Sequence, residues 1–226
     1  MAKTPRLGQR ALVEFIGTLI FVFVGAGSVV AVNSLSPTYP GLLIIALANG
    51  IGLALAVTFA MNISGGHMNP AVTIGMLVTR KIKALDSLAY IIAQLLGATA
   101  GALLLVALMP GASGAAVHYG TPALAPSVGL AQGIALEAVM TAFLVFMVFG
   151  TAVDSRAPRV GGFGIGLMVA LDVIVGGSLT GAAMNPARAM GPAIASMSFA
   201  NWYVYWIGPI IGAVVAALVY SYCVQD

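Results

Sequence analysis

The chain has 226 residues, of which 61% are hydrophobic and only 7% are charged, and its mean hydropathy is +1.07. Soluble domains carry about 25% charged residues, so this composition excludes a water-soluble protein and indicates an integral membrane protein. The net charge of +3 does not point to nucleic acid as a partner, and the single cysteine, Cys223, excludes an internal disulfide and a cysteine metal site.

Six apolar segments are long enough to cross about 30 Å of hydrocarbon as helices that rise 1.5 Å per residue. Such long runs favour helices over a β-barrel, whose strands alternate in short segments. The sequence therefore predicts an all-α membrane protein. We expect the spans near residues 9–32, 42–62, 84–108, 128–151, 160–178 and 202–223.

The positive charges predict the orientation of these spans. Eight of the nine Lys and Arg residues fall on one side of the membrane, so the positive-inside rule predicts that both termini are cytoplasmic. We expect a multi-pass protein of the cell membrane. Arg188 is the exception, because it lies on the opposite side or within the membrane, and it is therefore a functional candidate. The eight are Lys3, Arg6, Arg10, Arg80, Lys81, Lys83, Arg156 and Arg159.

The two halves of the chain resemble each other. "EFIGTLIFVF" from Glu14 matches "EAVMTAFLVF" from Glu137, and Asn69 matches Asn185. Each half contains three spans, which is an odd number, so the second copy is expected to be inverted in the membrane. The sequence thus predicts a single domain over residues 1–226, built from inverted repeats at about 9–108 and 128–223.

Two stretches, "SGGHMNPAVT" and "TGAAMNPARA", interrupt apolar sequence with an Asn-Pro-Ala motif. Asn is a preferred N-cap, and Pro is favoured at the first helical position, so each motif predicts the start of a helix. The 12 residues of 69–80 and of 185–196 would form about 18 Å of helix, which is half a bilayer. The motif residues are Asn69, Pro70, Ala71, Asn185, Pro186 and Ala187.

Glycines before each motif are expected to let an extended backbone enter the membrane, at Ser64-Gly65-Gly66 and at Gly176-Gly177. Inversion would bring the two half-helix N-termini together near the midplane, where their positive dipole ends oppose cations. The capping Asn side chains could donate to a passing water. The carbonyls of Gly65, Gly66 and His67 could accept from it.

These motifs closely resemble the aquaporin, or major intrinsic protein, family over essentially the whole chain. The resemblance implies six transmembrane helices with two re-entrant half-helices, and a homotetramer with one passive pore in each protomer. It also implies that Glu14 and Glu137 support the re-entrant loops by hydrogen bonds. The matching residues are Glu14, "SGGHMNPAVT", Gln94, Glu137, "MNPAR" and the "YWIGP" of the last span.

The resemblance further implies a selectivity filter formed by Asn49, Val173, Ala182 and Arg188. Strict water channels usually carry Phe and His beside the Arg, whereas glycerol facilitators usually carry Trp, Gly and Phe, so this chain matches neither pattern. A ring without His, and with Val and Ala walls, is expected to be wider and less polar than a strict water filter. Ala189 stands where facilitators usually have Asp, which favours water.

The predicted function is a passive channel for water, with small neutral solutes such as glycerol or dissolved gases as further candidates, that excludes ions and protons. The alternatives are a glycerol-type facilitator, an ion-coupled secondary transporter, which membrane carboxylates would also suit, and a structural protein with a closed pore. Asp172, in mid-span, could make a helix-end contact or tune the neighbouring Val173. The sequence contains no phosphate loop, metal constellation or nucleophile–base pair, so we expect no enzyme activity, no metal and no cofactor.

Four aromatic residues stand together at the start of the last predicted span. An aromatic belt at the membrane interface has this composition, so we expect them to lie at the membrane surface. They are Trp202, Tyr203, Tyr205 and Trp206.

Overall fold

The computed structural model describes residues 5–35, 41–109, 111–158 and 160–224, and within these ranges it contains helices and no strand. Lys3, Arg159 and most of the connection between the first two spans lie outside them. The long helices follow the predicted spans closely. They are α1 (Leu7–Asn33), α2 (Gly41–Ala60), α4 (Ala84–Leu108), α6 (Leu130–Val148), α7 (Phe163–Thr180) and α9 (Val204–Val224), with a π-helical turn at Phe149–Val153 that continues α6.

The surfaces of these helices fit lipid. Each of the six spans has an 18-residue window of high hydropathy, yet at most 44% of the residues of any such window are buried in the protein. Large apolar side chains such as Leu55, Leu85 and Val175 are instead about two-thirds exposed. Apolar residues that face outward in this number need a hydrocarbon environment, so the fold is that of a membrane protein.

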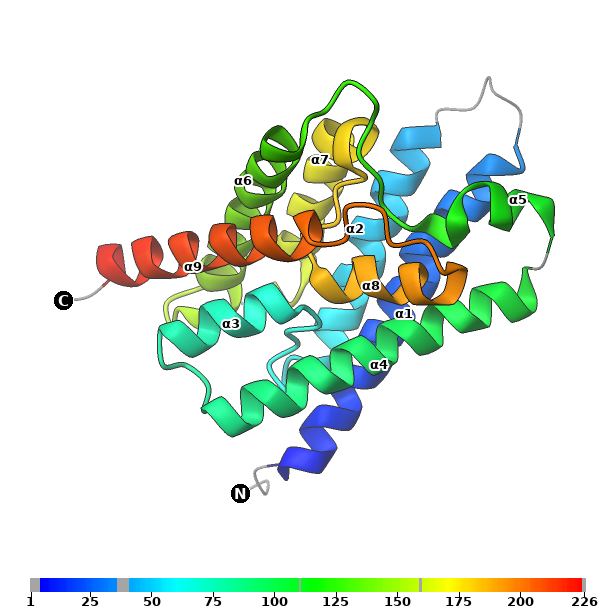
Figure 1. Cartoon of the computed structure of the whole chain (residues 1–226). Helices are drawn as coiled ribbons and strands as arrows, with labels where there is room; N and C mark the ends of the chain where they lie inside the picture. Colours follow the sequence, from blue (N-terminus) through cyan, green and yellow to red (C-terminus); the bar gives the residue numbers. More distant parts are fainter. Residues whose placement is uncertain (1–4, 36–40, 110, 159, 225–226) are drawn as a thin grey trace.

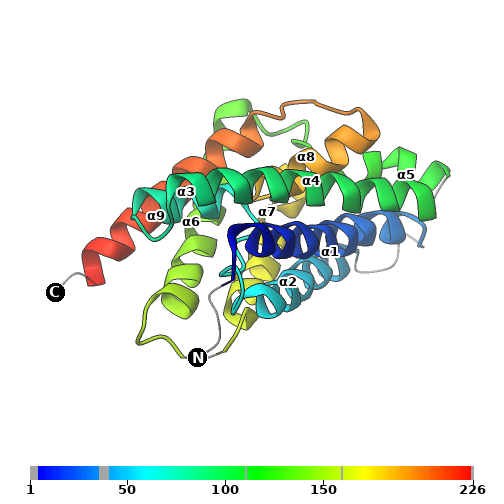
Figure 2. The same cartoon turned by 90° about the horizontal axis from the view of Figure 1, so that it is seen from below.

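Two shorter helices lie among the long ones. These are α3 (Pro70–Val78) and α8 (Pro186–Ser196), which extend in opposite directions from a common region at the centre of the molecule (Figures 1 and 2). Their lengths, 9 and 11 residues, correspond to about half of a hydrocarbon core. The predicted half-helices are therefore present, although α3 ends two residues earlier than expected.

The prediction that Gly176 and Gly177 form the extended entry segment before α8 was wrong. Gly176 and Gly177 belong to α7, and the non-helical segment that leads to α8 begins at Gly181. A Cβ on Gly177 would lie 2.8 Å from a methyl carbon of Leu42, and one on Gly176 would overlap the thioether of Met140. These two glycines therefore permit close packing of α7 rather than an extended backbone.

Glycine also sets the distance between paired helices. The helix α4 packs along α1, and α9 packs along α6. A Cβ added to Gly101 would lie 2.6 Å from the carbonyl oxygen of Leu19 on α1, and one on Gly208 would lie 2.7 Å from that of Ile134 on α6. Small residues let backbones approach in this way in membranes, where packing rather than the hydrophobic effect holds helices together.

We expect Gly212→Ala to destabilise the protein, because its Cβ would overlap the backbone carbonyl of Ala138 on α6, and backbone cannot move aside as a flexible side chain can. A forced shift of packed helices costs about 1–3 kcal/mol. Thermal unfolding in detergent should show a lower midpoint. Gly8→Ala is the control, since a Cβ there meets nothing within 4 Å; an equal loss in both variants would contradict the packing argument.

Candidate pore at the junction of the half-helices

Each half-helix is capped by the asparagine of its motif. The side-chain oxygen of Asn69 accepts a hydrogen bond from the backbone of Ala71 at 2.8 Å, and that of Asn185 accepts from Ala187 at 2.9 Å and from Arg188 at 3.2 Å. The proline that follows each asparagine begins the helix, where its missing N–H leaves no bond unmade. The local sequence therefore places both helix N-termini.

The same two asparagines also join the half-helices to each other. Asn69 Nδ2 donates to the carbonyl of Met184 at 2.8 Å, and Asn185 Nδ2 donates to the carbonyl of Met68 at 2.9 Å. Both methionines have a positive φ, 49° at Met68 and 51° at Met184. Such backbone is costly for a residue other than glycine and is concentrated at functional sites. The reciprocal bonds bring the two N-termini into direct contact.

Glu14 holds the first re-entrant loop from within α1. Its fully buried carboxylate accepts from the backbone N–H groups of His67 at 2.9 Å and Met68 at 2.6 Å. Two side chains add to this, Ser64 Oγ at 2.6 Å and Gln94 Nε2 at 2.8 Å. A non-helical backbone inside a membrane needs its polar groups satisfied by the protein, and here Glu14 provides the acceptor.

Glu137 holds the second loop in the corresponding way from α6. Its buried carboxylate accepts from the N–H groups of Ala183 at 3.0 Å and Met184 at 2.7 Å, and from Thr180 Oγ1 at 2.7 Å. The bonds of Glu14 and Glu137 correspond one to one, except that Glu137 has no counterpart of Gln94. Both oxygens of each carboxylate thus accept hydrogen bonds that hold the loop leading to the motif.

Two tyrosines complete this support, and the sequence did not identify them. Tyr90 donates to the carbonyl of Ser64 at 2.7 Å, and Tyr205 donates to the carbonyl of Thr180 at 2.8 Å. The prediction that Tyr205 lies in an interfacial belt was wrong, since only 1% of it is exposed. Its position inside the repeated pattern, 115 residues after Tyr90, was the available signal.

Arg188 lies in the first turn of α8 and is buried. Its Nη1 donates to the carbonyl of Gly120 at 2.7 Å. Gly120 ends a 3₁₀ turn at His118–Gly120, which follows the short helix α5 (Ala112–Ala116), and its α-carbon is packed so closely on α1 that a Cβ would lie 2.7 Å from the carbonyl of Ala26. The sequence did not identify Gly120 as a partner of Arg188.

The other predicted filter residues are buried on neighbouring elements. Asn49, on α2, donates through Nδ2 to the carbonyls of Gly25 at 3.3 Å and Ile45 at 2.9 Å. Asn49 thus bonds to Gly25 of α1, and Gly120, the partner of Arg188, packs against the next residue of that helix, Ala26. Val173 is buried on α7, and Ala182 is buried in the non-helical segment that leads to α8.

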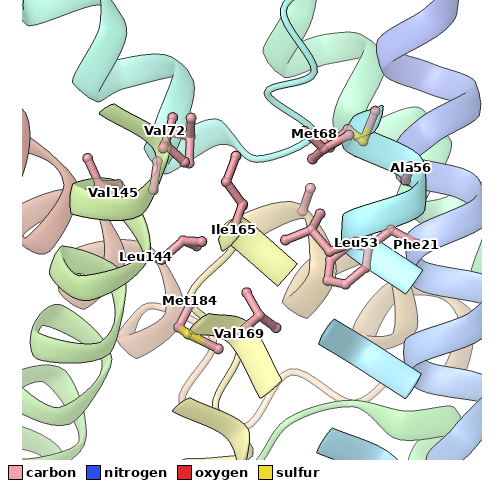
Figure 3. Packing of buried hydrophobic residues seen from close by; sticks show 14 of the residues in the cluster. Phe21, Leu53, Ala56, Met68, Val72, Leu144, Val145, Ile165, Val169 and Met184 are labelled. Carbon is pink, nitrogen blue, oxygen red and sulfur yellow. The ribbon is translucent and has the colours of Figure 1, made fainter. Parts of the chain in front are cut away.

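An apolar cluster surrounds the junction of the loops. Figure 3 shows side chains of α1, α2, α6 and α7 that face a common interior together with Met68, Val72 and Met184. On the side of α3, a cavity of about 270 Å³ reaches the segment Gly65–His67 and is also lined by Lys81 and Ile165. The junction is therefore surrounded largely by apolar side chains.

Asp172 differs from the two glutamates. It is buried on α7 next to Val173, and its Oδ2 has no hydrogen-bond partner among the described residues. A buried carboxylate oxygen without a partner in a membrane span is costly and marks a candidate functional position.

We expect Asp172→Asn to raise the thermal midpoint in detergent, because a neutral amide of the same size costs less to bury than a carboxylate whose oxygen is unpaired. The gain should be about 1 kcal/mol. Asp86→Asn is the matched control, since the Asp86 carboxylate is 3.0 Å from Arg10 and its loss should lower the midpoint slightly. A lower midpoint for Asp172→Asn would mean that the carboxylate has a stabilising partner.

Comparisons with known proteins agree with this geometry. The model of the major intrinsic protein family matches residues 1–220. The chain is 44% identical to aquaporin TIP4-4 of Zea mays over 94% of its length and 85% of that protein, and 39% identical to the probable aquaporin TIP3-2 of Arabidopsis thaliana over 99% and 86%.

Among solved structures, the aquaglyceroporin of Plasmodium falciparum shares the fold. Its X-ray structure superposes with a TM-score of 0.84 over 95% of this chain and 96% of that one, at 22% identity. The matched family model, the extent of the identity to the plant aquaporins and the paired half-helices lead to one conclusion: this chain belongs to the major intrinsic protein family.

Proposed function

We propose that this protein is a passive channel for water that also admits small neutral solutes and excludes ions and protons. The observation that carries the proposal is the direct contact between two half-helix N-termini, made by Asn69 and Asn185. Irregular backbone at this depth occurs where it is buried in protein or lines a water-filled path. The chain, residues 1–226, then forms one channel domain of inverted repeats, 9–108 and 128–223.

The electrostatics of this junction favour neutral solutes. Both helix dipoles direct their positive ends to the same region, which opposes cations. Each Asn Nδ2 has two hydrogens, and one is used in the bond to the opposite loop. The second hydrogen of Asn69 and of Asn185 can be donated to a passing water, while the carbonyls of Gly65, Gly66 and His67 accept. A water that accepts from both amides cannot continue a proton wire.

The filter would be formed by Asn49, Val173, Ala182 and Arg188. Val173 and Ala182 are small, and the amide of Asn49 is bonded to backbone of α1 and of its own helix. These features support a wide ring in which the guanidinium of Arg188 supplies the charge that repels cations. Solutes of the size of glycerol are therefore included in the proposal.

A glycerol-type facilitator is the second candidate. The non-aromatic filter ring favours it, whereas Ala189, which stands directly after Arg188 where facilitators usually have Asp, argues against it. An ion-coupled transporter is not favoured, because the two carboxylates that the repeat places in matching positions, Glu14 and Glu137, are each engaged by the loops they support and Asp172 has no counterpart in the first half. By family resemblance the assembly is a homotetramer in the lipid bilayer. The proposed location is the cell membrane.

Stopped-flow light scattering of proteoliposomes tests the proposal. With a sucrose gradient, the wild-type chain should give water permeability well above that of empty liposomes, and the flux should be linear and indifferent to ionophores. A glycerol gradient then measures solute entry. Permeability equal to that of lipid alone, from folded protein, would reject the channel, and saturable, ion-dependent flux would favour the transporter.

The proposed orientation places both termini in the cytoplasm. Cys223 is exposed in the last turn of α9, so a membrane-impermeant maleimide should label it in inside-out vesicles and not in intact cells. Ala116→Cys in a Cys223→Ser background should show the opposite pattern, because the exposed Ala116 lies at the other end of the spans. Labelling of Cys223 from outside would reverse the orientation.

A further inference from the structure

A second cavity lies away from the half-helix junction, beside the π-helical end of α6. It has a volume of about 530 Å³ and opens between the C-terminal ends of α3 and α9, which Figure 1 shows close together near the C-terminus. Cavities of this size hold small organic ligands. Its lining includes Arg80, Lys81, Asp154, Tyr220 and Ser221.

The charge of this cavity is positive because its one carboxylate is already paired. Asp154 accepts from Arg156 at both oxygens, at 3.0 and 2.9 Å, and from the hydroxyl of Tyr220 at 3.1 Å. The Arg156 guanidinium holds the pKa of the Asp154 carboxyl well below its usual range. Arg80 and Lys81 form no ion pair with any described residue, so two cations face the cavity without a counter-charge from Asp154.

The lining also contains an unused hydroxyl. Serines inside helices usually bond to the carbonyl four residues earlier, as Ser87 does with Lys83 at 3.0 Å and Ser196 with Pro192 at 2.8 Å. The Oγ of Ser221 is buried and makes no such bond, nor any other within the described residues. Ser221 also lines the cavity, so a rotation of its side chain toward the cavity would let this hydroxyl donate to a ligand there.

We propose that this cavity binds a phosphate group, and that its source is the headgroup of an anionic phospholipid. Arg80 and Lys81 supply the positive charge, and Ser221 donates a hydrogen bond to a phosphate oxygen. Val78 and Leu218 line the same cavity and are 42% and 50% exposed. These apolar side chains provide a surface for acyl chains, which a free phosphate would not need.

Lys81 connects this site to the candidate pore. It lines both this cavity and the 270 Å³ cavity that reaches Gly65 and His67, and Val153 is likewise common to both. A phosphate that holds the Lys81 ammonium in the outer cavity would remove a positive charge from the mouth of the water path. This consequence rests on the proposed channel function, whereas the lipid site does not.

Native mass spectrometry of the full chain in detergent tests the site, with short-chain phosphatidylglycerol, phosphatidylcholine and inorganic phosphate as probes. We expect phosphatidylglycerol to be retained, and to bind about tenfold more weakly to Arg80→Gln and to Lys81→Gln, which each lose one charge-assisted bond. Ser221→Ala should lose less. Lys83→Gln removes an equal charge from a residue that does not line the cavity, and it should bind normally.

Equal losses in Lys83→Gln, or no preference over phosphatidylcholine, would overturn the site. Inorganic phosphate binding as tightly as the lipid would overturn the lipid source. Water permeability is then measured in phosphatidylcholine liposomes with and without phosphatidylglycerol, and should rise with the anionic lipid. Lipid binding without water permeability would reject the channel function but not the lipid site. Water permeability that is the same with and without phosphatidylglycerol would reject only the proposed effect of Lys81 on the water path.

Discussion

Glu137→Ala is expected to abolish stable folding. The substitution leaves the N–H groups of Ala183 and Met184 and the hydroxyl of Thr180 without their acceptor, at a depth where water cannot replace it. Each orphaned buried donor costs about 1–3 kcal/mol, so the sum approaches the 5–15 kcal/mol that stabilises a typical protein. Size-exclusion chromatography of detergent extracts should show aggregate in place of a monodisperse peak.

The matched pair Glu137→Gln and Glu14→Gln sharpens this prediction. A glutamine presents one oxygen and one NH₂ group, and the NH₂ conflicts with any donor that it faces. On Glu137 one carboxylate oxygen accepts from Met184 alone, whereas on Glu14 both oxygens accept from two donors each. Glu14→Gln should therefore be the less stable of the two in thermal unfolding. The reverse order would show that the carboxylates act otherwise than as acceptors.

The half-helices were predictable because their signals are local. Asn69 and Asn185 cap the first turn with their own side chains, and the prolines after them fix φ and lack an N–H. The six spans were equally predictable from the sequence, since their hydropathy is a property of composition and not of packing. Neither the half-helix starts nor the spans depend on tertiary contacts with the rest of the chain.

The misplaced entry segment depended on tertiary contacts. Glycine serves both for positive φ and for close packing, and the sequence does not distinguish Gly176 and Gly177, which pack on neighbours, from Gly181, whose φ is 81°. The partner of Arg188 could not be predicted from the sequence for a related reason. Gly120 contributes a backbone carbonyl, and every residue has one, so no residue type marks the contact.

The two tyrosines show what the repeat could have revealed. Tyr90 and Tyr205 make equivalent bonds to the residues that begin each loop, Ser64 and Thr180. An aromatic cluster near a span end is more often interfacial, and that expectation prevailed over the weaker spacing signal. Side chains that support a buried loop are found by comparing halves rather than by comparing each span with the membrane average.

Arg188→Ala should retain water flux and lose selectivity. The guanidinium is the one basic side chain among the four proposed filter residues, so its removal widens the ring and takes away the charge that repels cations. We expect glycerol entry to rise, and a proton or potassium leak to appear that the wild type lacks. Stopped-flow scattering measures the solute, and a pH-sensitive dye inside the same proteoliposomes measures the proton leak.

Arg188→Lys separates charge from shape. Lysine keeps the positive charge but not the planar fork that bonds Gly120, so it should exclude cations while admitting more glycerol than the wild type. Thermal unfolding of both variants checks that loss of the Gly120 bond has not unfolded the loop. Unchanged glycerol entry and unchanged ion exclusion in folded Arg188→Ala would remove Arg188 from the filter, and the contact of the two half-helix N-termini would then be the barrier to ions.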